Sequence, residues 1–78
     1  MIITFSKHAL KRMSERSIPR GAVIEAISHP DKSHHEEDKI IAIKRTNGKV
    51  LLVIYKNQDS ILFVITVVSS SKISKYLK

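Results

Sequence analysis

The sequence predicts an α+β fold, in which two N-terminal helices pack on an antiparallel β-meander of three strands. Residues 2–5 are a candidate fourth strand, and a short helical segment is expected at the C-terminus. Three observations support this prediction. The chain has 78 residues, enough for one domain spanning 1–78. Apolar residues recur at helical spacing up to about residue 28. From residue 39 onward, β-branched residues dominate three runs separated by short turns.

The two helices are predicted from their end signals. Ser6 is suited to cap the first helix, because a serine hydroxyl accepts a hydrogen bond from the free N–H groups of a first turn. This helix is expected to extend to about Glu15 or Arg16. The second begins near Pro19, whose fixed φ suits a first turn. It extends to about Ser28 and is ended by His29-Pro30, because the residue before a proline avoids the α region. The predicted buried faces consist of Ala9, Leu10 and Met13 in the first helix and Val23, Ile24, Ala26 and Ile27 in the second.

The strands are predicted at residues 39–46, 49–56 and 60–68, after a polar, acidic stretch at 31–38 that is expected to be a surface loop. Asn47-Gly48 indicates a hairpin, because a type I′ turn needs positive φ at both positions. Ser69 to Ser71 are expected to cap the final helical turn. The last two strands are apolar on both faces, and the helices can cover only one of them. The second face therefore predicts a homodimer, a protein partner or a covering C-terminal segment.

The charge favours a polyanionic partner. The net charge is +7, with 14 basic and 7 acidic residues, which is typical of domains that bind a phosphate polymer. The alternative is that the charge serves solubility alone. Cysteine is absent, so disulfides and thiol chemistry are excluded, and a reducing cytoplasmic location is expected. The longest apolar run, residues 61–68, is too short to span a bilayer, and no membrane association is predicted.

His8, Arg12 and Arg16 follow one another at intervals of four residues, which places them in a stripe along the border of the first helix's buried face. Arginine matches phosphate geometry, and histidine exchanges protons near neutral pH. The three are therefore candidate catalytic residues for metal-independent cleavage of a phosphodiester. The alternative is a charged helix edge that forms only surface ion pairs, with Glu15 as the acidic member.

Other basic and aromatic residues are candidates for nucleic-acid contacts. These candidates are Lys44, Arg45, Lys72, Lys75 and Tyr76. Lys44 and Arg45 point to opposite faces of their strand, so only one can line a given cleft. His34 and His35 stand beside three carboxylates, but their spacing does not match a metal-binding motif. No metal site and no cofactor are predicted.

The segment from Phe5 to Pro19, with Val23, Ile27 and Pro30, resembles a widespread family of short prokaryotic domains of unknown function. Members of that family open with a pattern close to H-A-x-x-R-M-x-x-R-x-I and finish in a β-meander. Their layout is similar to RelE/ParE-like and BrnT-type toxins, which are small basic ribonucleases. The resemblance implies a RelE-like fold, an RNA substrate that is either free or ribosome-associated, and an antitoxin partner. Many relatives carry glycine where this chain has Ser17.

Three functions follow as hypotheses. The first is a RelE/BrnT-like toxin acting as a metal-independent endoribonuclease. The second is a non-catalytic module that binds nucleic acid or a protein through the same stripe. The third is a small structural dimer without a ligand.

Overall fold

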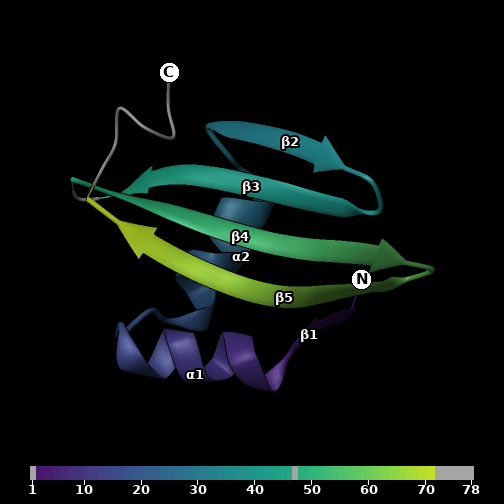
Figure 1. Cartoon of the computed structure of the whole chain (residues 1–78), viewed down its shortest axis with the longest axis horizontal. Coiled ribbons are helices and arrows are strands. Elements are labelled where there is room, and N and C mark those ends of the chain that lie inside the picture. Colours follow the sequence, from purple (N-terminus) through teal and green to yellow (C-terminus); the bar gives the residue numbers. More distant parts are fainter. Residues whose placement is uncertain (1, 47, 72–78) are drawn as a thin grey trace.

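The computed structural model describes residues 2–46 and 48–71, which form two helices and one five-stranded sheet (Figure 1). The helices are α1 (Lys7–Glu15) and α2 (Arg20–Ser28). The strands are β1 (Ile2–Phe5), β2 (Lys32–Glu36), β3 (Lys39–Thr46), β4 (Lys49–Gln58) and β5 (Ile61–Ser70). Their order in the sheet is β1-β5-β4-β3-β2. The fold is α+β, as the sequence predicts.

The predicted sheet was wrong in its extent and in the direction of one strand. The expected meander is its centre, since β3, β4 and β5 pair antiparallel to their neighbours. However, β1 pairs parallel to β5, so the sheet is mixed rather than antiparallel. The RelE-like arrangement of three antiparallel strands, or four at most, is therefore not the fold of this chain.

The acidic stretch at 31–38, expected to be a loop, contains the edge strand β2 instead. The prediction of a loop from polar composition was wrong, because an edge strand needs few apolar side chains when most of its surface faces solvent. Asp31 holds the start of this strand in place. Its N–H donates to the carbonyl of Ile43 over 2.8 Å, and its carboxylate accepts the N–H of Arg45 over 2.7 Å.

The end of the last strand also differs from the prediction. β5 continues through Ser69 and Ser70, which pair with Leu51 and Val50, so these serines do not start a helical turn. Backbone pairing with a long neighbouring strand outweighs the low β-propensity of serine here. The remainder of the predicted C-terminal helical segment, 72–78, lies outside the described residues.

The hydrophobic core lies between the helices and one face of the sheet (Figure 1). α1 packs against β5, and α2 packs against β3 and β4. The buried core residues are Ala9, Met13, Val23, Ala26, Ala42, Leu51, Val53, Tyr55, Leu62, Val64 and Val67. Leu10 and Ile24 were predicted to be buried but are 41% and 40% exposed, because each helix contacts the sheet along a narrower stripe than its sequence pattern suggests.

A β-bulge at Ile65 determines which residues of β5 face the helices. Tyr55 pairs with Val64 and Ile54 with Thr66, so Ile65 has no partner on β4. The inserted residue reverses the alternation that follows it. Val67 therefore faces the core, whereas the neighbouring Val68 is 38% exposed on the other face. Strict alternation along this strand predicts the reverse.

Ser6 ties α1 to this bulge. It caps the helix as predicted, accepting the N–H of Ala9 over 3.0 Å. Its hydroxyl also donates to the carbonyl of Ile65 over 2.6 Å, and its own N–H donates to the carbonyl of Val64. Because one short residue makes all three bonds, the start of α1 is fixed against β5.

Candidate anion-binding site

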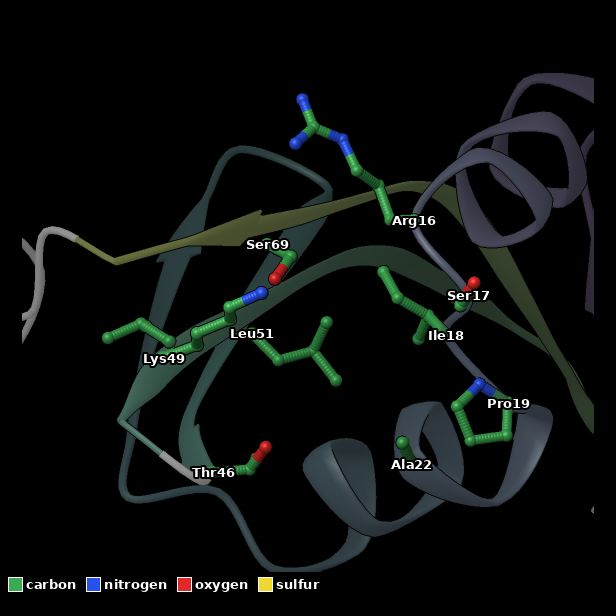
Figure 2. Close-up of a pocket in the computed structure, with 10 residues that line it drawn as sticks. Arg16, Ser17, Ile18, Pro19, Ala22, Thr46, Lys49, Leu51 and Ser69 are labelled. Carbon is green, nitrogen blue, oxygen red and sulfur yellow. The ribbon is translucent and has the colours of Figure 1, made fainter.

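A polar hollow opens where the loop between α1 and α2 passes over the ends of β4 and β5 (Figure 2). It encloses about 380 Å³. It is lined by Arg16, Ser17, Ile18, Pro19, Ala22, Thr46, Lys49, Val50, Leu51 and Ser69. An adjacent hollow of about 300 Å³ shares Arg16, Lys49 and Ser69 and adds Ser70 and Ser71. We call the two together the Arg16–Lys49 pocket.

The end of α1 brings Arg16 to the rim of this pocket. Arg16 is the C-cap residue, and its N–H donates to the carbonyl of Arg12. The chain then turns through Ser17, whose φ of 54° is in the left-handed region. The N–H of Ile18 closes the turn by donating to the carbonyl of Met13 over 2.8 Å, as in a Schellman motif. Figure 2 shows the guanidinium extending outward above the hollow.

The hairpin between β3 and β4 supplies the second cation. Lys49 is the first residue of β4 and pairs with Thr46 across the two-residue turn, in which Gly48 has a φ of 78°. Alternation along β4 places Lys49 on the same face as the buried Leu51. In Figure 2 its side chain runs into the hollow toward Ser69.

Hydroxyl groups complete the site. Ser17, Thr46 and Ser69 line the larger hollow, and Ser69, Ser70 and Ser71 line the adjacent one. A hydroxyl donates one hydrogen bond, and the two cations supply charged donors. No carboxylate or histidine is among the described residues that line either hollow. The arrangement thus suits a ligand that carries negative charge and several acceptor oxygens, such as a phosphate group.

A family model described as "Domain of unknown function (DUF4258)" matches residues 5–69. The chain belongs to the DUF4258 family. All residues that line the larger hollow fall within the matched range. No curated protein and no solved structure matches the chain with significant similarity. Among the described residues, the helices of this DUF4258 domain are too short and too polar to cross a membrane.

The predicted catalytic stripe does not converge on one point in this DUF4258 domain. Of its three members only Arg16 lines the pocket, and His8 and Arg12 are exposed along α1. Eight residues separate His8 from Arg16, which is about 12 Å along a helix axis. That separation is too large for both side chains to act on one phosphate without a large movement.

The strand residues proposed for nucleic-acid contacts are also separated. The ammonium of Lys44 donates to the carbonyl of His29 at the end of α2, over 2.8 Å. That contact stabilises a helix C-terminus, where a positive charge is favourable. Arg45 pairs with Val50 on the opposite face of the sheet. Lys72, Lys75 and Tyr76 lie outside the described residues.

The adjacent histidines also lie apart. His34 and His35 occupy consecutive positions on β2, so they point to opposite faces of the sheet. Within the ranges 2–46 and 48–71, no three metal-ligating side chains gather at one place.

Lys49, Thr46 and the serines of the pocket were missed by reasoning from sequence. The sequence did contain one signal for Lys49. Extending the face of Leu51 and Val53 back by one step of the alternation reaches Lys49, at the hairpin beside Thr46. What the sequence did not reveal is that β5 continues to Ser70 and that the α1–α2 loop lies above this end of the sheet.

Proposed function

We propose that this DUF4258 domain binds single-stranded RNA through the Arg16–Lys49 pocket and does not cleave it. The observation that carries the proposal is a hollow lined from three separate segments by several hydroxyls and Lys49, with Arg16 at its rim. The net charge of +7 supports it, because a basic domain attracts a phosphate polymer before any specific contact forms.

The shape of the site favours a single strand. The larger hollow is a concave site of about 380 Å³ between two layers of the fold, which is the size of a small-ligand site. A duplex is normally bound by an element that projects into a groove, whereas a flexible strand can place one phosphate or nucleotide inside a hollow. The apolar side chains of Ile18 and Pro19 at its wall offer a surface for a base or a sugar.

Because the fold is not RelE-like, the choice of RNA as the ligand rests on the net charge and on the pocket, and not on a similarity to toxins. The geometry gives less support to cleavage. A metal-independent endoribonuclease needs a proton donor or acceptor within hydrogen-bonding reach of the scissile phosphate. His8, the candidate for that role, stands two helical turns from Arg16. Binding without cleavage is therefore the function that the site supports best.

Fluorescence anisotropy with a labelled 12-nucleotide RNA, measured at several salt concentrations, tests the proposal. Arg16→Gln and Lys49→Gln are each expected to weaken binding and to reduce the dependence of log K on log salt by about 0.7, the value for one phosphate contact on a single strand. Arg12→Gln and Lys11→Gln are the matched controls. They remove the same charges from exposed positions on α1 outside the pocket.

The control variants separate the pocket from general electrostatics. If Arg12→Gln and Lys11→Gln weaken binding as much as the pocket variants do, RNA responds to total charge and the pocket is not its site. Tighter binding of duplex DNA than of the single strand contradicts the choice of ligand.

A second measurement addresses cleavage. Total RNA is incubated in EDTA with the wild-type protein, His8→Ala and Arg12→Ala. We expect intact RNA in all three. Cleavage by the wild type that His8→Ala abolishes would overturn the non-catalytic proposal in favour of a toxin nuclease.

A further inference from the structure

The two hollows of the Arg16–Lys49 pocket have different linings. Both are lined by Arg16, Lys49 and Ser69. Ser70 and Ser71 complete the smaller hollow, so every described residue that lines it is polar. The larger hollow adds a different set without a charged member, which consists of Ser17, Ile18, Pro19, Ala22, Thr46, Val50 and Leu51. The positive charge of the pocket therefore belongs to the residues that the two hollows share.

The smaller hollow suits a phosphate group. Its lining combines charged donors with serine hydroxyls, and both kinds of group donate hydrogen bonds to phosphate oxygens. In Figure 2 the ammonium of Lys49 points toward the hydroxyl of Ser69, so a charged donor and a neutral donor lie at the same place. The hollow encloses about 300 Å³, which leaves room for one phosphate and the ester groups beside it.

The remainder of the larger hollow suits an uncharged group. Five of the seven residues found only there are apolar. Leu51 is 5% exposed and belongs to the hydrophobic core, so it forms an apolar floor. Ser17 and Thr46 add hydroxyls, which both donate and accept hydrogen bonds. A nucleoside matches this lining, because its base has apolar faces with polar edges and its ribose carries hydroxyls.

The two linings together limit which nucleotide of a strand can enter. A nucleotide inside a strand carries a phosphate on each side of its ribose, whereas a nucleotide at an end with a free hydroxyl carries only one. If an internal nucleotide entered the larger hollow, one phosphate would lie beside Lys49 and the other would meet the uncharged lining. Taking a phosphate out of water without a cation beside it is strongly unfavourable. The pocket therefore favours a nucleotide with a single phosphate.

We propose that the Arg16–Lys49 pocket recognises the free end of a single-stranded RNA. The terminal nucleoside occupies the larger hollow, and its one phosphate lies in the smaller hollow beside Lys49 and Ser69. The strand leaves past Arg16, whose guanidinium extends outward at the rim and meets the next phosphate (Figure 2). This inference rests on the proposed RNA binding and narrows it to a strand end that carries a hydroxyl, on the 5′ or the 3′ side.

A circular RNA tests the proposal, because it has the bases and phosphates of a linear strand but no end. An unstructured RNA of about 24 nucleotides, longer than the site of one small domain, is labelled at an internal base and compared before and after ligation into a circle. Fluorescence anisotropy at one salt concentration should show roughly tenfold weaker binding of the circle, which corresponds to the loss of one bound base. Equal affinities would overturn end recognition and leave RNA binding in place, whereas no binding of either form would overturn both.

Phosphates added to the ends of the linear strand give a second test. A strand phosphorylated at both ends should bind roughly tenfold more weakly than one with two hydroxyl ends, because the added phosphate would meet the uncharged lining. Strands phosphorylated at the 5′ end alone or the 3′ end alone then identify the end that enters. If the doubly phosphorylated strand binds as tightly as the strand with two hydroxyl ends, the proposed placement of the terminal nucleoside is wrong.

Thr46→Phe tests the larger hollow without removing a charge. Thr46 is half-buried at the end of β3 and lines only the larger hollow, and aromatic residues are favourable in strands. The variant should bind linear RNA as weakly as the wild type binds the circle, and its binding of the circle should not change. Thr4→Phe is the matched control, since Thr4 is also half-buried but lies on β1, outside both hollows. Circular dichroism establishes that each variant is folded. A folded Thr46→Phe that keeps the full preference for linear RNA would contradict the proposal.

Discussion

Replacing Ser6 with alanine removes the residue that joins α1 to β5. The hydroxyl accepts the N–H of Ala9 over 3.0 Å and donates to the carbonyl of Ile65 over 2.6 Å. Loss of an N-cap costs about 1 kcal/mol. Loss of the second bond, which leaves a partly buried carbonyl without this donor, adds about 1 kcal/mol. Ser6→Ala should therefore lower the free energy of unfolding by about 2 kcal/mol, a large part of the roughly 4–12 kcal/mol expected for a chain of this length.

Urea denaturation followed by circular dichroism measures this change, and thermal melting should show a Tm lower by about 10 °C. Ser6→Thr keeps a hydroxyl at the cap and should recover most of the loss. Ser14→Ala is the control for serine-to-alanine replacement in general, since Ser14 is exposed on α1 and alanine is the better helix former. A loss below about 0.5 kcal/mol for Ser6→Ala, or an equal loss for Ser14→Ala, would refute the reasoning that one hydroxyl joins helix and bulge.

Other consequences can be tested in the same way. Ser17 has a φ of 54°, so Ser17→Gly should raise the free energy of unfolding by about 0.5–1 kcal/mol, whereas Ser71→Gly, at an exposed site, should not. Burial raises the pKa of Tyr55 above its ordinary value of 10.0, so the folded state holds this proton to higher pH than the unfolded state does. Its contribution to stability is therefore complete below pH 10 and is lost as the pH rises through the raised value. Absorbance at 295 nm should show a late ionisation that Tyr55→Phe removes, and an early one would contradict the effect of burial.

The local signals in the sequence predicted the elements that depend on local chemistry. Ser6 caps α1, His29 ends α2, and β3 and β4 meet at the two-residue turn after Thr46, all as expected. Each of these depends on a conformational or hydrogen-bonding preference of one or two residues. The edge strands were harder to predict. β2 is polar because it lies at an edge, and the parallel pairing of β1 with β5 joins residues about sixty positions apart, for which no local pattern exists.

The site was predicted only in part, because it too depends on contacts between residues that are far apart in the sequence. Arg16 was identified from its spacing on α1, but spacing along a helix cannot show which end of the helix meets a cavity. The pocket forms only because the left-handed turn at Ser17 brings the α1–α2 loop back over the sheet and because β5 extends to Ser70. Neither His8 nor Arg12 reaches it, so the regular stripe in the sequence is not a functional unit in the fold.

The bulge at Ile65 determines which residues at the end of β5 lie on each face of the sheet. Without the bulge at Ile65, alternation along β5 would turn Val67 away from the helices and Val68 toward them. Ser69 would then face away from Lys49, and the pocket would lose its β5 hydroxyl. The bulge therefore places Ser69 beside Lys49 and Val68 on the sheet face opposite the helices, and it also offers the carbonyl that Ser6 binds. Deleting Ile65 should consequently impair RNA binding and the anchoring of α1 together, which no single surface substitution would do.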